Sequence, residues 1–323
     1  MLKLNHLSGF GSGVSGGGAA ASTYGYTLGG NSGARVIDGS KLTFADDTHA
    51  AATDANLTTG RDQHGYFSNA STHGYVMGGK NIAGTTIDDM EKLTYATDTT
   101  ATITDVLSTV RNNLQNVGVS DGTLAGYVSG GRSTSSPVAD ADKTTFADDT
   151  TAATTDANLS VARYELAGLS EGSTKGYFAG GYSTSALVSI ADKLTYATDT
   201  TTAETDANLP AVMVQPAGLS NNSTNGYWCG GNGAGGNVDA VSKLVFATDT
   251  TSANTDAVLS EAKNSMGDLN EGSSYGYTLG GISGARVTTA EKLDFATDIF
   301  ATATDADMLS VRTYVACLAD GAV

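Results

Sequence analysis

The sequence is poor in proline, cysteine and tryptophan, which account for 3, 2 and 1 of its 323 residues. It has no apolar run near the roughly 20 residues that a membrane-spanning helix requires, and no continuous apolar stretch follows its first basic residue. We therefore expect neither a membrane span nor a recognisable signal peptide. The 41 glycines lack the one-in-three period of collagen, which excludes a fibrous triple helix.

Positive charge is also scarce, because 17 Lys and Arg residues stand against 34 Asp and Glu residues and the formal net charge is −17. Such a charge repels a phosphate backbone unless basic residues gather locally, and the sequence contains no basic stripe. We therefore expect no nucleic-acid partner. Apolar residues still make up 40% of the chain, enough to bury a substantial core.

Two motifs each occur six times at a spacing near 50 residues, and such a period indicates a solenoid, a propeller or an array. The first reads Gly-Tyr-x-x-Gly-Gly and begins at Gly25, Gly74, Gly126, Gly176, Gly226 and Gly276. The second reads Lys-(Leu/Thr)-x-(Phe/Tyr)-Ala-x-Asp and begins at Lys41, Lys92, Lys143, Lys193, Lys243 and Lys292.

Each copy is predicted to contain four short strands. In the fourth copy, 176–181 forms a short apolar strand b, and 193–197 forms strand c, which alternates polar and apolar residues. A turn at 198–201 leads to strand d, and 217–220 supplies strand a of the next copy. Four strands of about five residues and their loops account for the period.

A four-stranded unit cannot cover both of its faces, so the copies must stack, and radial stacking gives a β-propeller. A linear stack is the alternative, but it needs polar capping repeats, and the first and last copies resemble the middle ones. Segment 316–321 aligns with 167–172 and has no strand b after it, whereas the first copy starts with strand b. The prediction is an all-β, six-bladed β-propeller of four-stranded antiparallel blades over 23–323, closed by the C-terminal strand joining the N-terminal blade.

These residues resemble the kelch repeat of galactose-oxidase-type propellers. The resemblance rests on the Gly-Gly pair, on an aromatic residue about 14 positions later (Phe44, Tyr95, Phe146, Tyr196, Phe246, Phe295) and on a basic residue beyond it (Arg61, Arg111, Arg163, Lys263, Arg312). Met213 replaces the basic residue in the fourth copy, and the tryptophan of the family is absent. The Gly-, Ala- and Thr-rich copies are also similar, more loosely, to propeller arrays in virion proteins of tailed phages.

Six aspartate pairs at a spacing of seven are interpreted as structural. They are Asp47 and Asp54, Asp98 and Asp105, Asp149 and Asp156, Asp199 and Asp206, Asp249 and Asp256, and Asp298 and Asp305. The first of each pair is expected to accept backbone N–H bonds in the turn between strands c and d. The second is expected to pair with a repeated Lys or Arg of its own or the next blade. The pairs lack the close clustering of a calcium loop, so no metal and no cofactor are expected.

Catalysis requires a unique, asymmetric set of residues, and the sequence has no nucleophile elbow, zinc-binding helix or phosphate-binding loop. His49, His64 and His73, all in the first copy, are interpreted as surface or loop residues. Cys229 and Cys317 are predicted to lie in different, non-adjacent blades without a disulfide. An enzyme is therefore the least favoured hypothesis.

The loops between strands b and c differ most among the copies, and they are predicted to share one face with the connections between blades. Their candidate binding residues are Arg35, Lys80, Arg132, Tyr182, Asn232 and Arg286. The alternative is that these loops have simply drifted in solvent.

Residues 1–22 form a Gly-rich segment outside the repeats, either a plain linker or a tether whose Leu4, Leu7 and Phe10 become ordered on a partner. The leading hypothesis is a non-enzymatic structural or interaction protein of a virion (decoration, tail or fibre), or of an extracellular assembly. It would be tethered to a capsid, tail or filament. The alternative is a glycan-binding or adhesion module that uses the variable loops.

Overall fold

The computed structural model describes residues 22–321, and the predicted tether with Leu4, Leu7 and Phe10 lies outside them. Within this range the chain is all-β, with four short 3-10 turns: η1 (Thr53–Ala55), η2 (Thr155–Ala157), η3 (Thr205–Ala207) and η4 (Thr304–Ala306). No helix in the described range has the length and apolar character that crossing a membrane demands.

Six antiparallel sheets of four strands make up most of the structure, and we number them along the chain. Sheet 1 contains β31 (Ala316–Ala319), β1 (Tyr24–Leu28), β2 (Gly39–Thr43) and β3 (Thr48–Ala51). Sheet 2 contains β5 (Gly65–Asn69), β6 (His73–Met77), β8 (Asp89–Thr94) and β9 (Thr99–Val106). Sheet 3 contains β10 (Gly118–Ser120), β11 (Ala125–Ser129), β12 (Ala141–Thr145) and β13 (Thr150–Ala153).

The other three sheets follow the same order. Sheet 4 contains β14 (Ala167–Glu171), β15 (Lys175–Ala179), β16 (Ala191–Thr195) and β17 (Thr200–Ala203). Sheet 5 contains β19 (Ala217–Ser220), β20 (Asn225–Cys229), β23 (Ala240–Val245) and β24 (Thr250–Val258). Sheet 6 contains β25 (Gly267–Asn270), β26 (Tyr275–Leu279), β29 (Ala290–Asp294) and β30 (Ile299–Thr302).

Short pairings decorate the loops beside these sheets. Their strands are β4 (Arg61–Asp62), β7 (Lys80–Asn81), β18 (Met213–Val214), β21 (Asn232–Gly233), β22 (Gly236–Asn237), β27 (Ile282–Ser283) and β28 (Ala285–Arg286). Each pairing involves a loop that follows a Gly-Gly pair.

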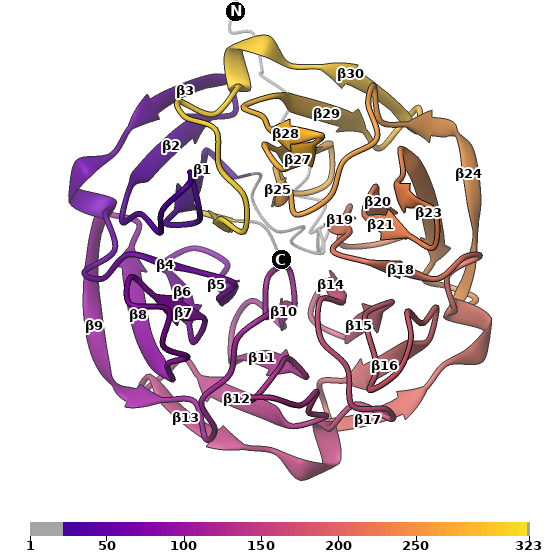
Figure 1. Cartoon of the computed structure of the whole chain (residues 1–323), viewed down its shortest axis with the longest axis horizontal. Helices are drawn as coiled ribbons and strands as arrows, with labels where there is room; N and C mark the ends of the chain where they lie inside the picture. Colours follow the sequence, from indigo (N-terminus) through magenta and orange to yellow (C-terminus); the bar gives the residue numbers. More distant parts are fainter. Residues whose placement is uncertain (1–21, 322–323) are drawn as a thin grey trace, which may run out of the picture.

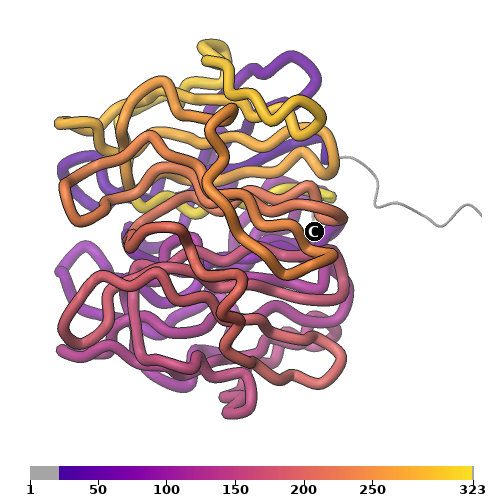
Figure 2. Tube along the Cα trace, turned by 90° about the vertical axis from the view of Figure 1, so that its right-hand side faces the viewer, coloured from indigo at the N-terminus to yellow at the C-terminus, as the bar shows by residue number. Residues whose placement is uncertain are grey.

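The six sheets follow one another around a common centre, with their first strands innermost and their last strands at the rim (Figure 1). The innermost strands contact one another in the cyclic order β31, β5, β10, β14, β19, β25 and back to β31. Seen from the side, successive sheets pack beside each other in sequence order (Figure 2). The architecture is compatible with the predicted propeller.

The two ends of the described chain meet in sheet 1. Strand β31 pairs antiparallel with β1, from Gly25 opposite Ala319 to Leu28 opposite Ala316. Beyond the strand, Asp320 Oδ1 accepts the backbone N–H groups of Thr23 and Tyr24 at 2.7 Å. The predicted pairing of the C-terminal segment with the first strand is confirmed.

The Gly-Tyr pair of the first motif fits against both neighbouring sheets. The tyrosine is buried and packs against the aromatic residue of the second motif in the next sheet, as Tyr177 does with Phe246 at a centroid distance of 5.5 Å. The glycine faces the preceding sheet, where a Cβ on Gly126 would lie 2.4 Å from Phe67 Cδ2. In each motif the tyrosine therefore packs on the next sheet, and the glycine lets the preceding sheet approach closely.

Removing 312–323 should leave β1 as an unpaired edge and expose the core that β31 covers. We expect a lower melting temperature and aggregation, measured by calorimetry and by light scattering after size-exclusion chromatography. Removing only 322–323 is the control and should leave both properties unchanged. A monodisperse 312–323 deletion with the melting temperature of the full chain would contradict the role of this pairing.

Candidate functional site

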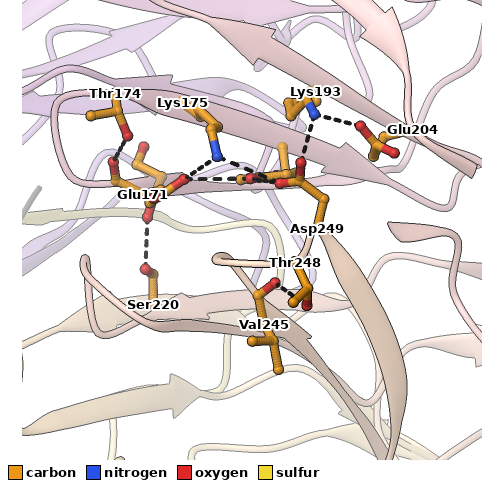
Figure 3. A network of polar contacts seen from close by, with 11 residues as sticks. Glu171, Thr174, Lys175, Lys193, Glu204, Ser220, Val245, Thr248 and Asp249 are labelled. Carbon is orange, nitrogen blue, oxygen red and sulfur yellow. Dashed lines mark hydrogen bonds and ion pairs between the residues drawn. The ribbon is translucent and has the colours of Figure 1, made fainter. Parts of the chain in front are cut away.

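The repeated Lys and the first Asp of each pair join neighbouring sheets. In the example of Figure 3, Lys193 Nζ of sheet 4 donates to Asp249 Oδ2 of sheet 5 at 2.7 Å and to Glu204 at 2.5 Å. Tyr177 Oη donates to Asp249 Oδ1 at 2.5 Å. Burial alone would raise the pKa of Asp249, but the hydrogen bonds from Lys193 and Tyr177 lower it below its ordinary value.

The same contact occurs at all six junctions between sheets. The Tyr, Lys and Asp residues are Tyr26, Lys41 and Asp98; Tyr75, Lys92 and Asp149; Tyr127, Lys143 and Asp199; Tyr177, Lys193 and Asp249; Tyr227, Lys243 and Asp298; and Tyr277, Lys292 and Asp47. Each Asp has a φ angle between 52° and 58°, a region that Asp tolerates better than most residues.

The expected roles of the aspartates are therefore corrected. Asp47, Asp98, Asp149, Asp199, Asp249 and Asp298 bond side chains of the preceding sheet, and none accepts a backbone N–H within residues 22–321. Asp54, Asp105, Asp156, Asp206, Asp256 and Asp305 form no ion pair in that range, although the carboxylate of Asp105 accepts the N–H of Thr151. The repeated lysines donate to the first aspartate of each pair instead, because that aspartate lies in the turn between strands c and d, beside the tyrosine of the preceding sheet.

A second contact between sheets uses the basic residue that precedes five of the six innermost strands. Gly30 of sheet 1 donates its N–H to the carbonyl of Arg61 at 2.8 Å, and the Arg61 guanidinium pairs with Glu91 of sheet 2 at 2.7 Å. Arg61 and Glu91 are no more than 1% exposed. Three equivalent buried pairs are Arg111 with Asp142, Arg163 with Asp192, and Lys263 with Glu291.

Two copies lack the acidic partner, and each is compensated differently. In sheet 5, Ser242 stands at the position that Glu91 has in sheet 2, and Met213 replaces the basic residue. Met213 packs in the apolar cluster that contains Trp228. In sheet 1 the acidic position is Ser40. The buried Arg312 there donates to the hydroxyls of Thr27 and Ser40 at 3.0 Å and to the Asp38 carbonyl at 2.8 Å.

The loops that follow the Gly-Gly pairs form one face of the ring, which we call the loop face (31–40, 80–90, 132–141, 182–191, 232–242 and 282–290). The residue after each Gly-Gly pair lies beside the residue after each basic position. Neighbouring pairs around the face include Lys80 with Asp62, Asn112 with Arg132, and Tyr164 with Tyr182.

The structure places all six predicted binding residues on this face, and several already have partners. Arg35 pairs with Asp62 at 2.7 Å, Asn232 donates to Asn237 at 3.1 Å, and Arg286 donates to Asn31 at 2.9 Å. Binding by these residues stays a prediction.

Arg132 and Tyr182 are brought together by Tyr164, a residue that the sequence analysis did not single out. The Tyr164 and Tyr182 ring centroids are 5.6 Å apart, and the Arg132 guanidinium lies 5.6 Å from the centre of the Tyr164 ring. The Arg132 guanidinium donates only to the Ser135 carbonyl, at 3.3 Å, so most of its side-chain N–H groups have no protein partner within residues 22–321. We call these three residues the aromatic patch.

His64 and both cysteines are buried in the structure. His64 is fully buried rather than at the surface, and burial followed by the charge of Arg61 lowers its pKa to about 3. Cys229 and Cys317 are buried free thiols in sheets 5 and 1, as predicted. No cluster of three or more His, Cys, Asp or Glu able to hold a metal ion occurs in the described part of the chain.

Comparison with known proteins adds no assignment, because no family model and no curated protein matches the chain.

Exchanging the apolar site of sheet 5 for an ion pair tests the second contact. Met213→Lys alone should destabilise the fold by about 3 kcal/mol, because it buries a charge without a partner. Adding Ser242→Glu should recover most of that loss, measured as the urea midpoint. Met213→Leu is the control for volume and should cost less than about 1.5 kcal/mol. Equal midpoints for the single Lys variant and the double variant would contradict the pairing.

Proposed function

We propose that the chain is a closed six-bladed β-propeller of the kelch type and that it works as a non-enzymatic interaction scaffold. Its support is the way in which polar residues are used. The repeated Tyr, Lys and Asp residues are engaged between sheets, and the buried bases are engaged with carboxylates, hydroxyls and carbonyls. Most Lys and Arg side chains within residues 22–321 are therefore already used to hold the structure together.

The location of the remaining cations carries the proposal. Within residues 22–321, Lys80, Arg132, Arg286 and Arg312 are the only Lys and Arg residues that form no ion pair. Arg312 is buried, and the other three lie on the loop face. In a chain with a net charge of −17, accessible cations without carboxylate partners are concentrated where an acidic or polar partner would dock.

The larger assembly is part of the same proposal. A virion structure, such as a capsid, tail or fibre, is favoured by the loose likeness of the repeats to phage propellers and by the Gly-rich segment at 1–22. In this arrangement the segment would hold the ring to the assembly, and the loop face would remain available to a partner.

Electron microscopy of native material tests this proposal. We expect rings of this size attached to a particle or filament, and attachment that is lost when 1–22 is deleted. The variant Lys175→Ala, which changes a cation paired with Glu171 away from the loop face, should stay attached. A native population of freely diffusing rings would count against the assembly role.

Glycan binding is the second candidate function, and the aromatic patch favours it. Aromatic rings stack on the apolar faces of sugars, and a free guanidinium donates to hydroxyl and carboxylate oxygens. Tyr164, Tyr182 and Arg132 place these groups side by side on the loop face.

A glycan array followed by calorimetry tests this second function. Arg132→Ala and Tyr182→Ala should each weaken binding of any saccharide found at least tenfold, since each removes part of the patch. Lys175→Ala is the control, because Lys175 pairs with Glu171 away from the loop face, and it should leave the affinity unchanged. Absence of binding to every saccharide would remove this candidate.

A further inference from the structure

The axis of the ring is lined by one residue from each innermost strand. Register places Tyr66, Gly118, Gly168, Gly218, Asp268 and Cys317 at equivalent positions, and all six line an axial cavity of about 100 Å³. The three glycines permit close approach of the strands, because a Cβ on Gly218 would lie 2.3 Å from the Gly168 carbonyl oxygen. At this level of the axis, side chains therefore come only from sheets 1, 2 and 6, as Cys317, Tyr66 and Asp268.

Three side chains from three different sheets or their connections meet there. Tyr66 Oη lies 2.6 Å from Asn116 Oδ1 and 2.5 Å from Asp268 Oδ1. Asn116 belongs to a two-residue insertion, Gln115 and Asn116, that only this copy has between its basic residue and its innermost strand. The insertion brings the Asn116 amide to the axis.

The orientation of the Asn116 amide is set by its nitrogen. Nδ2 donates to the carbonyls of Pro216 at 2.9 Å and Met266 at 3.0 Å, so both of its protons are used. The reversed amide would place an oxygen against two carbonyl oxygens. Asn116 Oδ1 therefore faces Tyr66 as an acceptor.

Counting protons at Tyr66 gives the protonation state of Asp268. The phenol has one proton, but its oxygen is in hydrogen-bond contact with two acceptor atoms, Asn116 Oδ1 and Asp268 Oδ1. Both contacts are satisfied only if Asp268 Oδ1 carries a proton and donates it to Tyr66, which then donates to Asn116. Asp268 Oδ2 accepts the Gly218 N–H at 2.7 Å and needs no further donor.

We propose that Asp268 is a proton-binding site on the axis, and that its bound proton completes a hydrogen-bonded chain from Asp268 through Tyr66 to Asn116. The chain links sheet 6, sheet 2 and the insertion before sheet 3. Loss of the proton leaves one phenol proton for two acceptors and an ion in a buried site, so the link weakens. The ring is thus held more tightly across its axis in acid, and the inference does not depend on the function of the loop face.

The surroundings of Asp268 favour the neutral acid. No cation pairs with it within residues 22–321, and the ionisable groups that face it are Tyr66 of β5, Cys317 of β31 and Cys229 of β20. Burial keeps these three groups neutral by raising the pKa of each well above its ordinary value. Burial also raises the pKa of Asp268 to about 6, although the hydrogen bonds that Tyr66 and Gly218 donate to the ionised carboxylate act in the opposite direction.

The sign of the pH dependence follows from this. The folded protein holds the proton up to about pH 6, whereas the unfolded chain releases it near pH 4. The stabilisation by the proton is therefore complete below pH 4 and is lost as the pH rises through 6. A two-unit difference in pKa corresponds to roughly a hundredfold change in the unfolding equilibrium constant.

Carbon-13 NMR of the full chain, labelled at aspartate carboxyl carbons, measures the site directly. We expect one aspartate resonance to titrate near pH 6 and to be missing in Asp268→Asn. Correlation of each carboxyl with its own backbone amide assigns Asp268 even if that variant fails to fold. Titration of Asp268 below pH 4.5 would overturn the proposal.

Urea unfolding between pH 4 and 7 measures the coupling to the fold. Relative to Asp268→Asn, whose amide can still donate to Tyr66 at every pH, the natural chain should lose roughly a hundredfold in its folding equilibrium across this range. Asp54→Asn changes an exposed aspartate and should keep the slope of the natural chain. Parallel slopes for the natural chain and Asp268→Asn would also contradict the proposal.

Discussion

Everything in this structure depends on contact between neighbouring sheets, because a sheet of four short strands leaves both of its faces uncovered. The repeated residues are arranged for that purpose. The tyrosine of one sheet packs on the aromatic ring of the next sheet. Its hydroxyl and the lysine of its own sheet both donate to the aspartate of that next sheet. A single set of residues thus provides apolar burial and a directional polar contact at the same junction.

Two polar devices act at the junctions between sheets, and they differ in how they tolerate change. The contact of a buried Tyr with a partly exposed Lys and Asp is present in all six copies. The fully buried ion pair is present in four, and its two departures remain chemically consistent. Met213 accompanies Ser242 in an apolar site, and Arg312 accompanies Ser40 with hydroxyl and carbonyl acceptors. Burial makes an unmatched charge costly, so both members change together or new acceptors replace the lost one.

Much of the fold could be predicted from the sequence, because the repeat has a fixed period and strand-like patterning. The four strands per copy and the pairing of 316–319 with the first strand both followed from alignment of the copies. The partners of the aspartates could not be predicted, because a spacing of seven within one copy carries no information about the neighbouring copy. Tyr164 was also missed, since it becomes notable only when Tyr182 lies beside it. The axial residues depart from the repeat in the sequence itself. Gln115 and Asn116 are an insertion, and Tyr66 and Asp268 stand where three other copies have glycine.

The junction at which the two ends of the described chain meet has a consequence for biosynthesis. Gly25 pairs with Ala319, so the first sheet lacks its innermost strand until Ala319 has left the ribosome. Five sheets can assemble from local hairpins during translation, but the ring waits for its most distant contact, the slowest kind to form. Until then the exposed edge of β1 can pair with β31 of another chain. The spacing of nascent chains on a polysome therefore affects whether each chain closes its own ring or exchanges β31 with a neighbour.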